Sequence, residues 1–217
     1  MPKDIRQLLF KRIGPFRNPR FYEWFFTKSP LATLRARDEE VIFRSLGEVI
    51  KPDHSVLEVG PGPGNYTVPV AHRCKDMVAI DPSSKMLQYL RKRLTREGLT
   101  NVGTQLGRLP DGLEAPKKFD GVLTIGVLLY VEEIEESLRA LASTLKPGGW
   151  AIFNVALDTT EGRIYNALTG PVSGRRMNLL SLEEAIEFAE KAGLRVQETT
   201  PSGFSRAGLT LVITAVA

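Results

Sequence analysis

The sequence predicts an α/β fold in which an open, mostly parallel β-sheet is covered by helices on both faces. Two observations carry this prediction. From residue 55 onward, short apolar runs alternate with longer segments of helical periodicity. The first apolar run leads directly into a turn with three glycines at alternate positions. Alternation of this kind is typical of parallel sheets, whose ligands bind beyond the C-terminal ends of the strands.

The chain before this alternating region is predicted to be helical. Residues 4–13 place their apolar side chains on one helical stripe, an aromatic cluster follows in residues 16–26, and residues 35–50 predict a second amphipathic helix. We therefore divide the chain into an N-terminal helical arm or lid, residues 1–50, and one main domain, residues 51–217.

Strands and helices alternate through the main domain. The strand candidates are rich in Val, Ile, Leu and Phe, and the amphipathic helices end at Gly or Pro. The predicted strands are residues 55–59, 77–80, 102–106, 119–125, 150–155, 194–199 and 209–216. The predicted helices begin near residue 65 and cover residues 84–97, 133–145 and 182–192.

The composition limits the chemistry that the chain can perform. Its 217 residues, of which 42% are hydrophobic and 25% charged, are typical of a globular domain. One cysteine excludes an internal disulfide and a zinc site with several thiolates, and the two histidines are far apart, so we expect no metal site. Because no apolar run could span a bilayer and the N-terminus lacks a signal-peptide core, we expect a cytoplasmic protein.

Positive charge is concentrated in residues 1–37, which hold nine basic and two acidic residues. This segment carries +7, so in a chain of net charge +4 the remainder carries −3. The main domain thus lacks the broad basic face of a nucleic-acid enzyme, and we expect no nucleic-acid partner. Basic groups beside aromatic side chains suit an anionic membrane surface, so residues 1–26 are a candidate peripheral membrane contact, with a lid over a pocket as the alternative.

The glycine turn indicates a nucleoside ligand. Gly60, Gly62 and Gly64 let the backbone approach a ligand closely, and Asp81 ends the next strand, where its carboxylate can accept hydrogen bonds from both ribose hydroxyls. The spacing lacks the third Gly or Ala of a dinucleotide fingerprint. Glu58, just before the turn, would repel a pyrophosphate but suits an ammonium group. S-adenosylmethionine has the ribose and the ammonium group and no phosphate.

These residues and two later motifs resemble the class I S-adenosylmethionine-dependent methyltransferases. The matching segments, in the family's order, are Glu58-x-Gly60-x-Gly62-x-Gly64, Asp81 within residues 79–87, Phe119-Asp120-Gly121-Val122 and Leu145-Lys146-Pro147-Gly148-Gly149-Trp150. The resemblance covers residues 55–155. It implies a Rossmann-like seven-stranded sheet of order 3-2-1-4-5-7-6 with strand 7 antiparallel, an N-terminal helical lid, and S-adenosyl-L-methionine as the cofactor.

The resemblance also implies roles for single residues. The backbone of the three glycines would border the methionine part of the cofactor, Glu58 would position their loop, and Asp81 would bind the ribose hydroxyls. Further cofactor contacts are implied for Pro82, Met86, Arg108, Leu109 and Gly126.

Arg108 departs from the family's pattern. The family commonly has an acid there that accepts a hydrogen bond from the adenine amino group, and a guanidinium cannot accept one. Three explanations stay open: the contact is lost, it is replaced by backbone near Leu109, or the third strand is assigned in the wrong register.

The acceptor side of the site rests on fewer residues. Methyl transfer from a sulfonium depends mainly on proximity and orientation, which can remove roughly 7–11 kcal/mol of the barrier. The segment 126–133 has no histidine. Tyr130, where many small-molecule members of the family carry His, is the candidate catalytic residue that orients the nucleophile, and Glu132 or Glu133 could attract a cationic amine. This pattern favours N-methylation.

Acceptor contacts are predicted for Tyr22, Tyr130, Arg175 and Arg176. Tyr22 lies in a segment that resembles the pocket cap of small-molecule members, and the arginine pair could face a phosphate. We expect a small molecule or a lipid head group as acceptor, compatible with bacterial phospholipid N-methyltransferases. The alternatives are a nicotinamide-dependent oxidoreductase, a non-catalytic cofactor-binding or membrane-associated protein, and a methyltransferase of RNA or protein.

Overall fold

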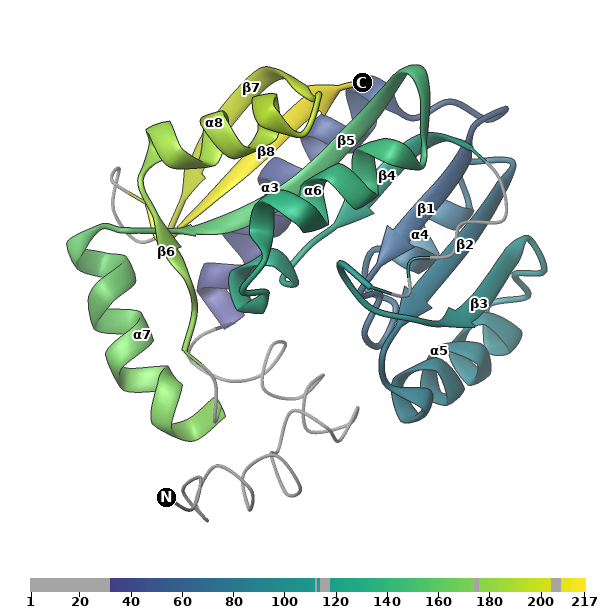
Figure 1. The fold of residues 1–217 in the computed structure, drawn as a ribbon. Helices are drawn as coiled ribbons and strands as arrows, with labels where there is room; N and C mark the ends of the chain where they lie inside the picture. The colour runs from purple at the N-terminus through teal and green to yellow at the C-terminus, as the bar shows by residue number, and fades with distance from the viewer. Residues whose placement is uncertain (1–31, 112, 114–117, 174–175, 204–207) are drawn as a thin grey trace.

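A computed structural model of the chain describes residues 32–111, 113, 118–173, 176–203 and 208–217 (Figure 1). The predicted first helix and the aromatic cluster therefore lie outside the described residues, as do the candidate membrane contact and most of the predicted lid.

One mixed sheet runs through the domain. Its strands are β1 (Ser55–Val59), β2 (Asp76–Asp81), β3 (Val102–Leu106), β4 (Phe119–Thr124), β5 (Leu145–Leu157), β6 (Leu179–Leu180), β7 (Arg195–Ser202) and β8 (Thr210–Val216). The order is β3-β2-β1-β4-β5-β8-β7, with β6 paired to β5. Strands β1 to β5 are parallel, and β8 is antiparallel to both β5 and β7. The predicted order and its antiparallel strand are confirmed, and β6 is a short addition.

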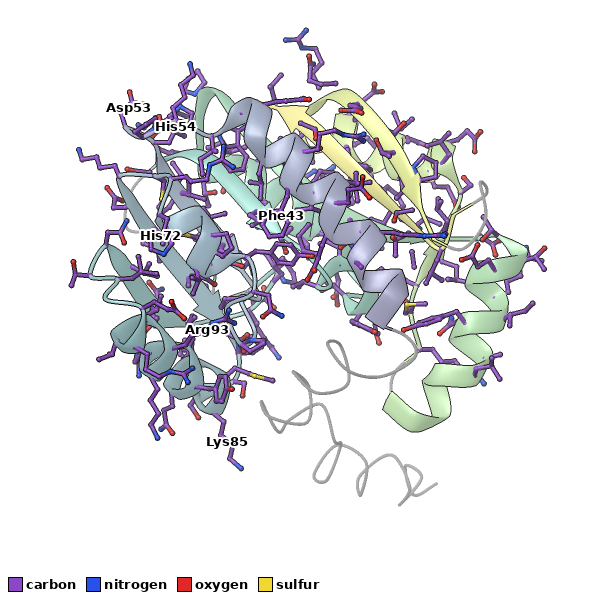
Figure 2. The ribbon with its side chains drawn as sticks, turned by 180° about the vertical axis from the view of Figure 1, so that it is seen from behind. Phe43, Asp53, His54, His72, Lys85 and Arg93 are labelled. Atoms are coloured by element: carbon purple, nitrogen blue, oxygen red, sulfur yellow. The ribbon has the colours of Figure 1, made fainter. Side chains whose placement is uncertain are left out.

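Helices cover both faces of this sheet. They are α3 (Ala32–Val49), α4 (Thr67–Ala71), α5 (Ser84–Arg96), α6 (Ile134–Ser143), α7 (Thr160–Ser173) and α8 (Leu182–Lys191), with a 3₁₀ turn η2 at Leu128–Tyr130. Figure 1 shows α6 and α8 in front of the sheet, and Figure 2 shows α3 across the opposite face. The predicted two-sided cover is confirmed.

The core consists of one apolar layer on each face of the sheet. Alternate residues of β1 enter different layers, since Leu57 packs on the α6/α8 side and Val56 on the α3/α4 side. All five residues of β1 are buried, which is the pattern of a central parallel strand. The C-terminal ends of β1, β2 and β4 therefore emerge from a rigid core.

Two elements differ from the sequence prediction. β5 begins at Leu145 and includes the Pro-Gly-Gly segment, which pairs with β4 through a shift in register between Phe119 and Gly121. α7 was not predicted, because Gly162 and Gly170 inside it indicate a helix break. Gly162 permits the helix to start beside β5, since a Cβ there would lie 2.1 Å from the Leu157 carbonyl oxygen.

Candidate functional site

The glycine turn after β1 adopts a conformation that requires glycine. Gly60, Gly62 and Gly64 have φ angles of 76°, 53° and 90°. A Cβ on Gly60 would lie 2.2 Å from Val127 Cγ2, and one on Gly64 would lie 2.5 Å from Leu90 Cδ1. The turn is therefore packed between the segment that follows β4 and helix α5.

Asp81 lies against this turn at the end of β2. Its side chain is buried, and Oδ1 accepts a hydrogen bond of 2.7 Å from the Ser83 N–H. Burial raises the pKa of Asp81, and the hydrogen bonds that its carboxylate accepts from the backbone of Ser83 and Gly62 oppose that shift. The predicted ribose-binding carboxylate thus directly contacts the predicted glycine turn.

Glu58 is buried beneath the same turn, with 2% of its surface exposed. Its Oε2 accepts a hydrogen bond of 2.6 Å from the hydroxyl of Thr67, which is the first residue of α4. Burial raises the pKa of Glu58 to about 7, the Thr67 hydrogen bond opposes the rise, and the negative charge of Asp81 adds to it. Glu58 links the strand before the turn to the helix after it, which is the contact that a loop-positioning role requires.

Arg93 on α5 provides a second support for the turn. Its Nη1 donates hydrogen bonds of 3.1 Å to the Pro63 carbonyl oxygen and 2.9 Å to Asn65 Oδ1. The residue is labelled in Figure 2. It therefore ties the helix that follows Asp81 to the loop that follows Glu58.

The segment after β3 bears on why Arg108 stands where the family commonly has an acid. β3 spans Val102–Leu106, the predicted bounds, and Leu106 pairs with Asp81, so Gly107 and Arg108 follow the strand directly. Arg108 is exposed and Leu109 is buried. A lost adenine contact and a backbone contact near Leu109 stay open. Of the two cofactor contacts predicted just after β2, Pro82 is exposed and Met86 is buried.

The segment after β4 is fixed at both ends by asparagine side chains. Gly126 has a φ of 74°, and its N–H donates to Asn154 Oδ1 at 2.8 Å. At the other end, Asn178 donates its backbone N–H to the Leu129 carbonyl oxygen at 2.8 Å and its Nδ2 to the Val131 carbonyl oxygen at 2.6 Å. Tyr130, the predicted catalytic residue, lies between these anchors in η2 with 36% of its surface exposed.

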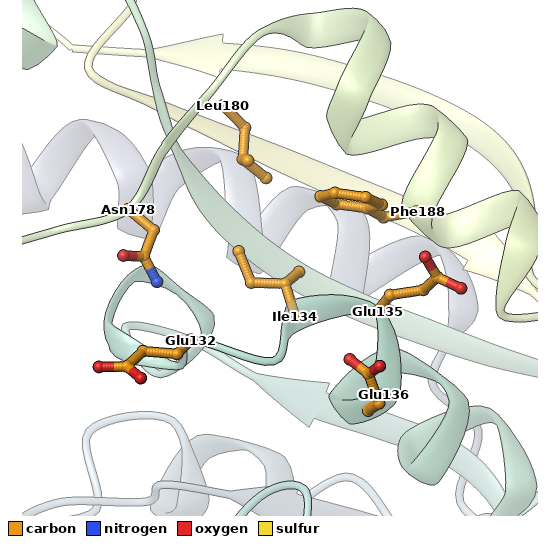
Figure 3. A pocket seen from close by; sticks show the side chains of 7 residues that line it. All are labelled: Glu132, Ile134, Glu135, Glu136, Asn178, Leu180 and Phe188. Atoms are coloured by element: carbon orange, nitrogen blue, oxygen red, sulfur yellow. The ribbon is translucent and has the colours of Figure 1, made fainter.

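A cavity of about 350 Å³ opens beside this segment, between α6, β6 and α8. Its lining residues are Glu132, Ile134, Glu135, Glu136, Asn178, Leu180 and Phe188. Figure 3 shows the three apolar side chains facing one another, with the carboxylates around them. Glu135 forms an ion pair with Arg139, whereas Glu132 and Glu136 are exposed. The cavity combines an apolar floor with an acidic rim.

The structure does not test the acceptor contacts predicted in the N-terminal segment and in the loop before β6. Tyr22 and Arg175 are outside the described residues, and Arg176 is exposed. His54 accepts a hydrogen bond of 3.2 Å from Trp150 Nε1. Figure 2 shows His54 and Lys85, the latter at the start of α5, at opposite ends of the molecule. Among the helices that the structure describes, none is both long and apolar enough to cross a membrane.

Sequence reasoning missed four residues that hold the site together, namely Thr67, Arg93, Asn154 and Asn178. Only Asn154 gives a signal in the sequence, as the one polar residue in the run Trp150–Leu157. The other three give no such signal. The partners of Arg93 and Asn178 are distant in sequence, and Thr67 bonds Glu58 across the turn.

Known proteins are similar to this chain in sequence and in fold. The family model described as "Methyltransferase domain" matches residues 56–149. The ubiquinone biosynthesis O-methyltransferase of Stutzerimonas stutzeri is 30% identical over 99 residues, which are 46% of this chain and 43% of that protein. The N-methyltransferase NodS of Bradyrhizobium japonicum, solved with S-adenosyl-L-homocysteine, has a TM-score of 0.71 at 21% identity, over 98% of both chains.

A further solved structure is the magnesium protoporphyrin IX methyltransferase of Synechocystis with bound S-adenosylhomocysteine. It has a TM-score of 0.67 at 19% identity and covers 85% of this chain and 83% of that one. The chain spans only 23% to 43% of the length of the first curated relatives that it matches. Residues 56–149 therefore match a methyltransferase domain, and the described fold is that of methyltransferases solved with bound S-adenosylhomocysteine.

Proposed function

We propose that the protein transfers the methyl group of S-adenosylmethionine to the nitrogen of an amine, carried by a small molecule or a lipid head group. The observation that carries the proposal is the contact between Asp81 and Gly62, which sets a buried carboxylate against a turn of left-handed glycines. A side chain on Gly60 would clash with the segment after β4, so this position of the turn has room for glycine only. Such a cradle fits a ligand with a ribose and no phosphate.

The residues of this chain would divide the work in the following way. Asp81 would accept hydrogen bonds from the ribose hydroxyls, and Glu58 would hold the glycine turn through Thr67. When bound, the cofactor supplies a methyl group on a sulfonium that leaves as a thioether. Tyr130 would orient the acceptor, and its partly exposed position after β4 supports that role.

The acidic cavity supports an amine as acceptor. Glu132 and Glu136 are exposed at its rim, and the Phe188 ring lies in its wall. Carboxylates and an aromatic ring together attract a cationic group. The described part of the site also has no histidine after β4 to act as a base, and an amine that has lost its proton needs none.

Two observations support a lipid head group among the amines. The segment 1–37 carries a charge of +7, which suits anionic lipid. α7 exposes two large apolar side chains one turn apart, with Ile164 55% and Leu168 70% exposed. These features support peripheral contact of a cytoplasmic protein with a membrane surface.

The first test is calorimetric titration with S-adenosylmethionine and S-adenosylhomocysteine, with NADH as the control. We expect the first two to bind and NADH not to bind. Binding of NADH alone would overturn the cofactor assignment in favour of an oxidoreductase.

The second test is a transfer assay with radiolabelled methyl donor and three acceptor sets: soluble primary amines, vesicles containing phosphatidylethanolamine, and phenols. We expect label in an amine set, and label in phenols alone would overturn N-methylation. With the accepted amine, Tyr130→Phe should lower turnover more than it weakens cofactor binding. Unchanged turnover would leave Tyr130 as part of the pocket wall.

A further inference from the structure

Asn154 is a buried polar side chain in an apolar strand. Only 3% of its surface is exposed, and its neighbours in sequence, Phe153 and Val155, belong to the core beneath α6 and α8. Its backbone lies in the sheet ladder opposite Val212 of β8. Burial of an amide is unfavourable unless the amide is hydrogen-bonded, so the side chain must have partners that repay this cost.

The described partner of Asn154 Oδ1 is the N–H of Gly126 at 2.8 Å. The parallel ladder between β4 and β5 ends at the pair Thr124 and Phe153, and beyond it the chain turns away at Gly126 with a φ of 74°. The Asn154 side chain thus supplies the acceptor that the ladder no longer provides. It fixes the place at which the segment after β4 leaves the sheet.

The next residue in that segment, Val127, contacts the glycine turn. A Cβ on Gly60 would lie 2.2 Å from Val127 Cγ2, so the valine methyl group occupies the space that a side chain at the first glycine would need. The backbone position of Gly126 therefore determines how closely the segment after β4 approaches the turn after β1. Core packing is dense enough that such a contact transmits a displacement.

We propose that Asn154 is a positioning residue for cofactor binding. Acting through Gly126 and Val127, it sets the spacing between the two segments that border the cofactor site, and it does not itself touch the cofactor. This inference rests on the proposed function. It predicts that cofactor affinity depends on an oxygen acceptor at this position.

The test compares Asn154→Leu, which has similar volume and no acceptor, with Asn154→Asp, which keeps an oxygen in place. S-adenosylhomocysteine is titrated calorimetrically into each folded variant. We expect Kd to rise about tenfold or more for the leucine variant, because a partly buried N–H loses its acceptor, and by less than about threefold for the aspartate variant. Equal weakening in both variants, or an unchanged Kd for the leucine variant, would overturn the inference.

Asn101→Leu is the matched control. Asn101 Nδ2 donates to the Ala71 carbonyl oxygen at 2.8 Å and to the Cys74 carbonyl oxygen at 3.3 Å, and its own carbonyl oxygen accepts from Met77 at the start of β2. It is a hydrogen-bonded asparagine at the opposite end of the sheet from Asp81. We expect a lower Tm and an unchanged Kd for S-adenosylhomocysteine. A Kd raised as much as in Asn154→Leu would mean that lost stability alone weakens binding.

Val127→Ala tests the second link without changing the core of β5. It removes the methyl group that faces Gly60, so we expect a Kd several-fold higher while the Asn154 hydrogen bond stays intact. An unchanged Kd for Val127→Ala would contradict the proposed role of Val127. This result can be obtained even if Asn154→Leu does not fold. Failure of the unsubstituted protein to bind S-adenosylhomocysteine would overturn the proposed function and this inference together, whereas binding without discrimination among variants overturns the inference alone.

Discussion

Glu58 and Asp81 place two buried carboxyl groups around one glycine turn. Both pKa values are raised by burial, and the negative charge of Asp81 raises that of Glu58 further. Neither carboxyl group has an ion-pair partner among the described residues. A cationic group bound at the turn would therefore stabilise the ionised form of Glu58.

The raised pKa of Glu58 predicts a pH-dependent stability. Its pKa rises from 4.5 to about 7 on folding, so between these values the folded state holds a proton that the unfolded state has lost. The contribution of Glu58 to stability is largest below the lower value and is lost as the pH rises to the upper one, a loss of about 3 kcal/mol. We expect Glu58→Gln to flatten this fall, measured by urea unfolding at pH 5 and pH 8. Parallel losses in both proteins would contradict the assignment.

Substitution of Asp81 should weaken cofactor binding. Asp81→Asn keeps one acceptor oxygen but removes the charge, and we expect affinity for S-adenosylhomocysteine to fall about tenfold or more. Asp76→Asn is the control, because Asp76 lies at the other end of β2 and accepts from the Ser55 hydroxyl at 3.0 Å. Calorimetry should find the control unchanged. If both variants bind alike, Asp81 is not the ribose ligand.

At the scale of elements, the glycine turn is held from three directions, by α4 through Thr67, by α5 through Arg93 and by the segment after β4 through Val127. Each support comes from a different part of the sequence. The turn is therefore a point of close packing as well as a ligand cradle, and its glycines serve stability and binding together.

Two glycines with positive φ separate the cost of close packing from the cost of backbone strain. Gly64→Ala adds strain at a φ of 90° and a contact of 2.5 Å with Leu90, so we expect a loss of about 2–4 kcal/mol. Gly98→Ala, at a φ of 69° in open space after α5, should lose only about 1–2 kcal/mol. Urea unfolding of both variants measures the difference. Equal losses would show that Leu90 moves aside freely.

The sequence predicts those elements whose residues repeat a simple period. The parallel strands and the helices α5, α6 and α8 follow from apolar spacing, and the turn follows from its glycines. α7 was missed because it contains glycines, and β6 was missed because it has only two residues. Both elements depend on neighbours that no local pattern encodes.

The same reasoning explains which site residues were found. Glu58 and Asp81 are polar residues at the ends of apolar strands, which is a local signal. Arg93 and Asn178 act through partners distant in sequence, and Thr67 acts on the Glu58 side chain across the turn, so only the folded chain identifies these three. Asn154 lies between these two cases: its apolar strand implies that it is buried, but only the folded chain identifies its partner.

At the scale of the whole molecule, charge is divided between a basic N-terminal segment and an acidic remainder. Residues 1–37 carry +7 and the rest −3. The acidic remainder includes the rim of the cavity beside η2. This division favours a cationic acceptor at the domain and an anionic surface for the N-terminal segment.

Removal of residues 1–20 should therefore reduce binding to anionic vesicles. We expect less sedimentation with vesicles containing anionic lipid, little sedimentation of either protein with neutral vesicles, and weaker binding of the full chain at high salt. Cofactor titration of both proteins serves as the folding control. Equal sedimentation with and without the segment would count against a membrane contact.

Cys74, whose carbonyl oxygen accepts a hydrogen bond from Asn101, provides a natural reporter of local opening. It is the chain's single cysteine, it is buried, and burial raises the pKa of its thiol to about 11. A thiol reagent therefore reacts mainly when this end of the sheet opens, so the labelling rate reports how much of the time the thiol is exposed. Ligand binding at the far end slows that rate only if the opening also disrupts the ligand site. One reagent thus distinguishes local fraying from cooperative unfolding without any engineered probe.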